Sequence, residues 1–252
     1  MIKLSDRLQL IANEIERGET VADIGTDHGF LPIYLWENGI SPKVIMADIS
    51  RGSLDKARQN CLEAHPDMKF DLRLGDGIGV LEAGEVDAVS IAGMGGILMT
   101  EILGADLEKT KSLKKFILQP RNHVGTLRHW LLDNGFEITN EQLVREGKYI
   151  CEILTVVPVD YGAGVVGGEP SDKADAYGIC GAEHDEIEYQ FPKTLAEFKN
   201  PLTMEYLDRH LKKENFILES MKSGNKTTLD EIKHQEDRIS YIERLVKTCE
   251  SR

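Results

Sequence analysis

Residues 21–30 constrain this chain more than any other part of its sequence. Four residues typical of a buried strand, Val21-Ala22-Asp23-Ile24, lead into a loop bounded by Gly25 and Gly29, and a helix is expected over 31–38. Glycines in such a loop allow a ligand to approach the backbone closely. Asp48 follows at the end of the next expected strand, where its carboxylate can accept hydrogen bonds from ribose hydroxyls. The pattern predicts an α/β fold with a pocket for an adenosine-containing cofactor.

The loop does not have the glycine spacing of a dinucleotide-binding site. The fingerprint G-x-G-x-x-G requires a glycine two residues after Gly25, but Asp27 stands there. A carboxylate at this place opposes the binding of a pyrophosphate at the helix N-terminus. S-adenosyl-L-methionine has no phosphates and carries a sulfonium and an ammonium, which Asp23 and Asp27 would suit. An ordinary strand-to-helix turn is the alternative interpretation of the loop.

Two further loops follow expected strands. Asp76 and Gly77 come after the third strand, where an acid can face an adenine amine, and the same Gly-Asp-Gly sequence is also typical of a turn. The fourth strand ends in Gly93-Met94-Gly95-Gly96 at the carboxyl edge of the sheet, where ligands bind in open α/β folds. We expect both loops to line the cofactor pocket.

Strands and helices alternate along the first part of the chain, which predicts a parallel sheet. A closing antiparallel hairpin is expected over 136–144 and 149–157. Ser5 and Ser50 are positioned to cap helices. The expected parallel strands are 20–24, 43–47, 69–74, 86–92 and 115–118.

The composition changes near Pro158, which divides the chain into three expected parts. Residues 1–158 form the cofactor-binding domain, and 159–196 form an acidic connection with few large apolar side chains. Residues 197–252 carry two helices with apolar positions every seven residues, typical of an antiparallel coiled coil. Helices packed on the sheet are the alternative. The predicted seams are Met204, Leu207, Leu211, Leu218 and Met221 in one helix, and Ile232, Gln235, Ile239, Ile242, Val246 and Cys249 in the other.

The charge distribution favours the C-terminal helices for contact with a polyanion. The chain has a net charge of −13, whereas residues 200–252 carry ten basic and ten acidic side chains. The four cysteines are far apart and form no metal-ligand pair, which predicts no metal site and a reducing cytoplasm. No run of apolar residues is long enough to span a bilayer. The sequence leaves the oligomeric state open and is compatible with a monomer.

Taken in order, these motifs identify a family resemblance. The loops around Asp23-Ile24-Gly25-Thr26-Asp27-His28-Gly29, Ala47-Asp48-Ile49-Ser50, Gly75-Asp76-Gly77, Gly93-Met94-Gly95-Gly96 and Gln119-Pro120-Arg121-Asn122 resemble those of the bacterial tRNA (adenine-22-N1)-methyltransferases. The resemblance implies a Rossmann-like class I methyltransferase sheet followed by a C-terminal antiparallel coiled-coil hairpin. It also implies transfer of a methyl group from S-adenosyl-L-methionine to N1 of adenine 22 in tRNA.

The resemblance assigns candidate roles to residues of this chain. Asp27 and Asn122 are the candidates for acting on the target base, with rigidifying the loop and capping the next helix as their alternatives. The candidates for contacting tRNA or the target base are Arg7, Met94, Gln119 and Pro120, and Arg7 is expected to contact a phosphate unless it is simply solvated. The candidates for cofactor binding are Asp23, Gly25, Thr26, His28, Gly29, Asp48, Ile49, Asp76, Gly77 and Gly93; His28 has a structural role as its alternative.

Three other functions are compatible with parts of this pattern. The chain can be a class I methyltransferase that acts on a small molecule or a protein, and the balanced charge of the C-terminal helices argues against this. It can be a nicotinamide oxidoreductase, which Asp27 and the missing glycine disfavour. It can also be a tRNA-binding module that retains a vestigial cofactor pocket.

Overall fold

The structure is a computed structural model that describes residues 2–159, 186–197, 200–224 and 227–250. The chain divides into two compact units, Met1–Val166 and Gly167–Arg252. Each unit is described by itself. Most of the expected acidic connection, residues 160–185, lies outside the described residues.

The first unit is built on a seven-stranded sheet with the order β3-β2-β1-β4-β5-β7-β6. The five strands β1 to β5 run parallel, and β7 pairs antiparallel with both β5 and β6. The predicted Rossmann-like sheet with a closing hairpin is therefore confirmed. The strands are β1 (Val21–Ile24), β2 (Val44–Asp48), β3 (Asp71–Leu74), β4 (Ala88–Met94), β5 (Lys115–Pro120), β6 (Phe136–Glu146) and β7 (Tyr149–Pro158).

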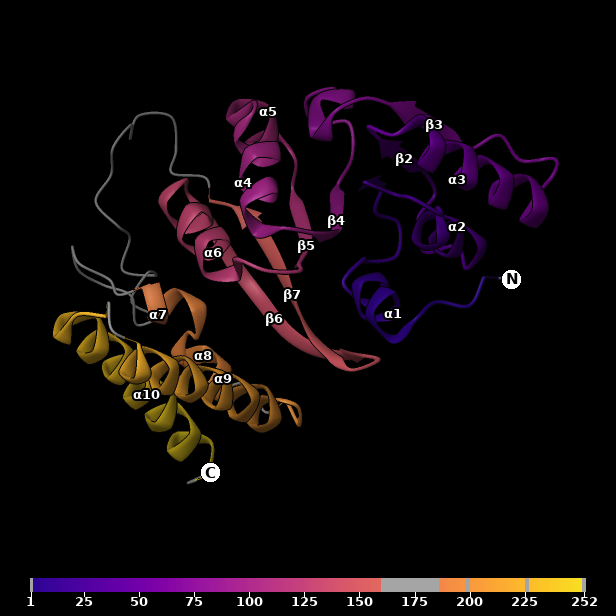
Figure 1. Ribbon diagram of the computed structural model, residues 1–252. Coiled ribbons are helices and arrows are strands. Elements are labelled where there is room, and N and C mark those ends of the chain that lie inside the picture. The colour runs from indigo at the N-terminus through magenta and orange to yellow at the C-terminus, as the bar shows by residue number, and fades with distance from the viewer. Residues whose placement is uncertain (1, 160–185, 198–199, 225–226, 251–252) are drawn as a thin grey trace. The chain divides into compact units, whose positions relative to one another are not determined.

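Helices cover both faces of this sheet. In Figure 1, α1, α2 and α3 lie on one side of the strands, and α4, α5 and α6 lie on the other. Neighbours within each group contact one another. The helices are α1 (Asp6–Asn13), α2 (Phe30–Glu37), α3 (Arg51–Ala64), α4 (Gly96–Gly104), α5 (Leu107–Ser112) and α6 (Val124–Asp133), with a 3₁₀ turn η1 (Gly77–Val80).

Local capping fixes where two helices begin. The Ser5 hydroxyl accepts a hydrogen bond from the backbone N–H of Leu8 at the start of α1, and Ser50 does the same for Ser53 at the start of α3. Both caps confirm the sequence prediction, because a serine oxygen satisfies an N–H that has no partner within the helix. α2 begins differently, after Gly29 in the left-handed conformation at φ +70°.

A buried charge cluster fastens the hairpin to α6. Arg128 is 1% exposed, and its Nε lies 2.7 Å from Glu141 Oε1 on β6 and its Nη2 lies 2.5 Å from Glu152 Oε2 on β7. Breaking one member of such a buried cluster leaves an uncompensated charge, so these contacts hold the hairpin firmly against the helix. The hairpin in turn carries Glu146 to the edge of the functional site described below.

The second unit contains α7 (Glu186–Gln190), α8 (Lys193–Glu197), α9 (Thr203–Ser223) and α10 (Leu229–Glu250). The short helices α7 and α8 fall within the segment 159–196, for which no helix was expected. Phe191 between them is fully buried, and its carbonyl accepts a hydrogen bond from the Tyr241 hydroxyl on α10 at 2.8 Å. These contacts with α10, rather than a local apolar pattern, stabilise the short helices.

α9 and α10 pack against each other as the predicted helical hairpin. Gln235 Nε2 of α10 donates to the carboxylate and to the backbone carbonyl of Glu214 on α9, at 2.8 and 2.9 Å. The capping box at Thr228 and Glu231 is present at the start of α10.

The predicted seam is only partly correct. Leu207, Gln235, Ile239 and Ile242 are buried, but Met204 is 37% exposed, and Tyr206 and Glu214 occupy the buried face of α9 instead. The prediction that Met204 lies on the seam is therefore wrong. The spacing of apolar residues does not predict that Glu214 is buried between the helices as the partner of Gln235.

Candidate functional site

A cavity of about 500 Å³ opens at the carboxyl ends of β1, β2 and β4. The strand order reverses between β1 and β4, which is where ligands bind in open α/β sheets. The structure brings most of the predicted site residues together on its wall. Those that line it are Arg7, Asp23, Gly25, Thr26, Asp27, His28, Asp48, Ile49, Asp76, Gly77, Gly93 and Met94.

Asp23 at the end of β1 is the most unusual group in the cavity. Asp23 is only 7% exposed, and its carboxylate makes no ion pair with any described residue. Desolvation by burial raises the pKa of Asp23 to about 6, although the Thr26 and Ser90 hydroxyls and the Arg7 guanidinium oppose that rise. A desolvated carboxylate without an ion-pair partner favours the binding of a positively charged ligand group.

The hydroxyls beside Asp23 are also left without partners. Thr26 Oγ1 and Ser90 Oγ are buried, and neither completes a hydrogen bond of good geometry with a described residue. Ser90 stands opposite Asp23 in the β1–β4 register. Buried polar atoms of this kind are unusual in a finished core, so they indicate a place that a polar ligand fills.

Two glycines shape the loop after β1 in different ways. Gly25 lines the cavity at φ +77°, and a Cβ there would lie 2.1 Å from Met94 Cε. Gly29 does not line the cavity; a Cβ there would lie 3.0 Å from Met46 Sδ and 3.2 Å from Ala57 Cβ. Gly25 therefore preserves the space at the cavity wall, and Gly29 allows the loop to pack against β2 and α3.

Asp27 lies at the mouth of the cavity in a strained backbone conformation, with φ +43°. Its Oδ1 accepts a hydrogen bond from Lys56 Nζ at 2.9 Å, and its Oδ2 lies 3.3 Å from His28 Nε2. The hydrogen bond from Lys56, with His28 adding to its effect, keeps the pKa of Asp27 below its ordinary value. The carboxylate therefore stays ionised at the mouth, with half of its side chain exposed.

Two more carboxylates stand at neighbouring strand ends. Asp48 Oδ1 accepts a hydrogen bond from Ser50 N at 2.7 Å, and its Oδ2 accepts a weaker one from Asp27 N at 3.4 Å. Asp76 precedes η1, and its side chain does not cap that turn. Gly77 has φ +50°, and a Cβ there would lie 2.8 Å from Ile102 Cγ2, so only glycine fits between Asp76 and α4.

The ends of β4 and β5 hold the loop that carries Met94. Gln119 is buried, and its Oε1 accepts a hydrogen bond from the backbone N–H of Gly93 at 3.1 Å. Neither Gln119 nor Pro120 lines the cavity, and Asn122 does not line it either. Asn122 is not the N-cap of α6, which is His123, and its backbone carbonyl accepts a hydrogen bond from Gly96 N at 3.0 Å.

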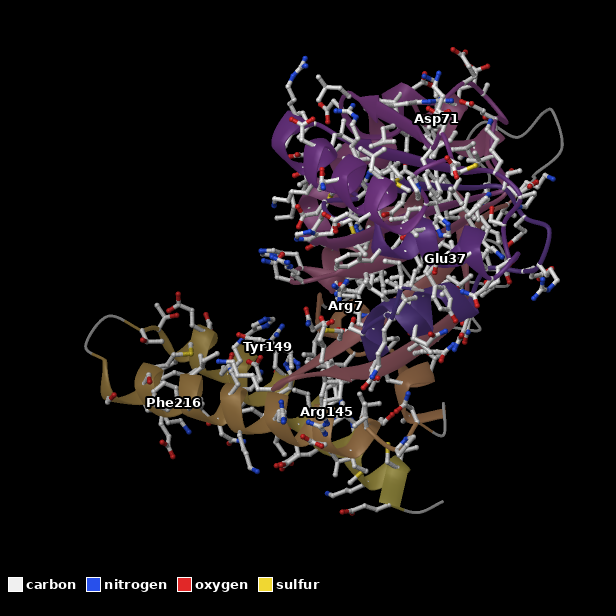
Figure 2. All side chains as sticks on the ribbon, turned by 90° about the vertical axis from the view of Figure 1, so that its right-hand side faces the viewer. Arg7, Glu37, Asp71, Arg145, Tyr149 and Phe216 are labelled. Atoms are coloured by element: carbon white, nitrogen blue, oxygen red, sulfur yellow. The ribbon has the colours of Figure 1, made fainter. Side chains whose placement is uncertain are left out.

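Arg7 reaches the cavity from α1, but its guanidinium is already engaged. Nε lies 2.6 Å from Glu146 Oε2 on β6, and Nη1 donates to Gln119 Oε1 at 3.0 Å. The side chain is 19% exposed, and Figure 2 shows it beside the β6–β7 hairpin that carries Arg145 and Tyr149. The guanidinium thus ties α1 to β5 and β6 rather than standing free at a solvated rim.

Sequence reasoning missed several residues of the site. Lys56 on α3 pairs with Asp27, and Arg121, Phe30 and Leu98 line the cavity. The Phe30 ring stacks on His28 with centroids 5.3 Å apart. Arg121 stands inside the Gln119–Asn122 motif, which indicates the right segment but not which of its side chains lines the cavity.

No group of His, Cys, Asp and Glu among the described residues is arranged to hold a metal ion. Among the described helices, none combines the length and the apolar character that crossing a membrane requires.

Together, the switch-point cavity, the glycine loop and the acids at three strand ends define a class I methyltransferase fold and site. Comparison with known families agrees, since residues 4–154 match the family model described as a methyltransferase domain. The chain belongs to this methyltransferase family.

Individual relatives within this family show which kind of methyltransferase the chain is similar to. The chain is 36% identical over 153 residues to the tRNA (adenine(22)-N(1))-methyltransferase of Bacillus subtilis, across 61% of this chain and 64% of that protein. It thus spans less than two thirds of the length of that relative. The crystal structure of the B. subtilis m1A22 tRNA methyltransferase TrmK superposes with a TM-score of 0.82 at 28% identity, over 98% of this chain and all of that one.

A second solved structure contains a ligand. It is Streptococcus pneumoniae Sp1610, a putative tRNA (m1A22) methyltransferase in complex with S-adenosyl-L-methionine, with a TM-score of 0.77 at 27% identity. The superposition covers 97% of this chain and 100% of that chain. The structural similarity therefore extends beyond the methyltransferase domain to the C-terminal helices.

Proposed function

We propose that this protein transfers a methyl group from S-adenosyl-L-methionine to N1 of adenine 22 in tRNA. The observation that carries the proposal is Asp23, a buried carboxylate without an ion pair at the base of the cavity. Neutral ligands and phosphates gain nothing from such a group, whereas the ammonium of the cofactor would compensate its charge. The unpartnered hydroxyls of Thr26 and Ser90 offer further acceptors at the same place.

The remaining acids fit the rest of the cofactor. Asp48 stands at the end of β2 with its carboxylate toward the glycine loop, where it would accept hydrogen bonds from the ribose hydroxyls. Asp76 and Gly77 would hold the adenine end, because the Asp76 carboxylate is not used as a helix cap. Gly25 leaves the room that a bound ligand needs beside Met94.

Methyl transfer to N1 of adenine requires little acid–base chemistry. The bound cofactor supplies an electrophilic methyl on its sulfonium; as the N1–methyl bond forms, the sulfur–methyl bond breaks and its electron pair returns to sulfur. N1 of a neutral adenine already has a lone pair, and the Gly93-Met94-Gly95 loop offers no side-chain acceptor for a proton. Rate enhancement would come from alignment of the base and exclusion of water, and Asp27 would stabilise the positive charge that passes to adenine.

The substrate assignment comes from the named relatives, which are tRNA methyltransferases. N1 lies on the Watson–Crick edge, so the target base must leave its stack to reach the cavity. The C-terminal helices α9 and α10 would dock the rest of the tRNA, since their segment lacks the net negative charge of the remaining chain. A cytoplasmic location, where tRNA is abundant, is part of this proposal.

The direct test is incubation of the protein with unmodified tRNA and methyl-labelled cofactor, followed by mapping of the labelled nucleoside. We expect 1-methyladenosine at position 22. A tRNA in which adenine 22 is replaced by guanine is the matched control and should remain unlabelled. Label on another nucleoside, or transfer only to small molecules or proteins, would refute the substrate assignment.

A methyltransferase acting on a small molecule or a protein is the competing assignment. A chain truncated after Val159 separates the two possibilities. If tRNA is the substrate, the truncated protein keeps its affinity for S-adenosyl-L-methionine but methylates tRNA far more slowly. Cofactor titration of the truncated chain serves as the control for folding. Equal tRNA turnover by both proteins would contradict a docking role for the C-terminal helices.

A further inference from the structure

The cavity wall contains two arginines among its described residues, and they differ in what they contact. Arg7 is mostly buried and is bound by Glu146 and Gln119. Arg121 is exposed, and its side chain makes no hydrogen bond or ion pair with the part of the chain that the structure describes. The other carboxylates and guanidinium groups that line the cavity are Asp23, Asp27, Asp48 and Asp76, all acidic, and Lys56 beside them is paired with Asp27 at 2.9 Å. Arg121 is therefore the cation at this opening that remains available to a ligand.

The backbone contacts of Arg121 place this residue beside Gly93 and Met94. Arg121 N donates to the carbonyl of Met94 at 2.7 Å, which joins the end of β5 to the end of β4. The guanidinium passes over Gly93, where a Cβ would lie 3.5 Å from Nη2 and 3.6 Å from Nε. Gly93 has φ +75°, and its N–H is held by Gln119. The guanidinium thus lies over the Gly93 backbone at the mouth of the cavity.

The nearby carboxylate of Glu146 does not form an ion pair with Arg121. Arg121 contributes to the electrostatic environment of Glu146, but that carboxylate is already bound by the Ser5 hydroxyl and by Arg7. A guanidinium that no carboxylate binds is suited to an incoming oxyanion, because its planar array of donors matches phosphate geometry.

We propose that Arg121 binds a backbone phosphate of the nucleotide whose base enters the cavity. The inference rests on the proposed function, because it assumes an RNA substrate. When a base is turned into the cavity, its flanking phosphates stay at the mouth, where three carboxylates would otherwise repel them. Arg121 supplies the opposite charge at that place, which is the role that the sequence predicts for Arg7. Phosphate contacts of this kind position a nucleic acid without reading its sequence.

Direct tRNA binding by the full-length chain tests the proposal without requiring turnover. Arg121→Ala, Arg121→Lys and the wild type are compared by fluorescence anisotropy over a range of KCl concentrations. Arg58→Ala is the matched control, since Arg58 is an exposed arginine on α3 that pairs with Asp55 at 2.7 Å and does not line the cavity. Titration with S-adenosyl-L-methionine reports whether each variant keeps its cofactor pocket.

Removal of one phosphate contact should reduce the slope of log affinity against log salt by about 0.7 to 0.9. We expect this change, with at least about tenfold weaker tRNA binding at low salt, in Arg121→Ala but not in Arg58→Ala. Arg121→Lys should restore the slope and only part of the affinity, because lysine keeps the charge but not the planar donors. Cofactor affinity should be unchanged in all variants.

Two results would overturn the proposal. If Arg121→Ala binds tRNA with wild-type affinity and salt dependence, Arg121 makes no phosphate contact. If affinity falls while the salt slope stays the same, the guanidinium stacks on a base instead. A wild-type protein that binds no tRNA at all would refute the proposed function itself, which is a separate result from either of these.

Discussion

Replacing Asp23 by asparagine should make the free protein more stable and its cofactor binding weaker. Asparagine has nearly the same shape but no charge, so the substitution removes the desolvated carboxylate while the cavity stays intact. The pKa of Asp23 is raised from 3.8 to about 6 by burial. Each unit of pKa shift corresponds to about 1.4 kcal/mol, so ionised Asp23 destabilises the folded state by up to about 3 kcal/mol.

The sign and the pH range follow from proton linkage. Because the folded-state pKa is higher than the unfolded one, the protonated carboxyl favours folding below pH 3.8, and this contribution is lost as the pH rises through about 6. The gain in stability of Asp23→Asn should be about 3 kcal/mol at pH 8 and roughly half of that at pH 5. For a unit of this size, the larger value corresponds to a rise in Tm of roughly 6–12 °C.

Thermal and denaturant unfolding of the free protein at pH 5 and pH 8 measure this effect. Asp67→Asn is the control, because Asp67 is exposed and lies outside the cavity. Calorimetric titration should show that S-adenosyl-L-methionine binds Asp23→Asn more weakly by about 1.5–3 kcal/mol, the usual contribution of a hydrogen bond to a charged group. If Asp23→Asn is no more stable than the wild type at pH 8, the argument from desolvation is wrong.

Three other substitutions test separate parts of the site. Asp48→Ala should weaken cofactor binding by about 1–3 kcal/mol in calorimetry, and wild-type affinity would refute its assignment to the ribose. Gly25→Ala should lower both Tm and cofactor affinity, because its Cβ would lie 2.1 Å from Met94 Cε at φ +77°, whereas Gly79→Ala, where a Cβ would meet nothing within 4 Å, should be nearly neutral. Asp27→Ala should slow methyl transfer in a single-turnover assay, by an increase of about 2–4 kcal/mol in the activation free energy. An unchanged single-turnover rate with weaker cofactor binding would show that Asp27 only shapes the pocket.

The sheet and the main site loops could be predicted because their signals are local. Apolar runs mark the buried strands, and Ser5 and Ser50 mark helix starts through contacts within four residues. The acids at the strand ends could be placed together because parallel strands end at one edge of a sheet. No such local signal exists for α7 and α8. Each has only five residues, and their stability depends on contacts such as that between Phe191 and Tyr241, fifty residues apart.

The two arginines of the cavity show where sequence reasoning reaches its limit. Arg7 is a predicted phosphate contact near the N-terminus, and Arg121 stands inside the Gln119–Asn122 motif. Nothing in their neighbours along the chain tells which guanidinium is free. The difference arises from the β6–β7 hairpin, which brings Glu146 to Arg7 across 139 positions of sequence. That carboxylate binds one guanidinium and leaves the other exposed at the cavity mouth. A charged side chain can be assigned to a ligand only after its partners within the fold are known, which is why we propose the phosphate contact for Arg121 and not for Arg7.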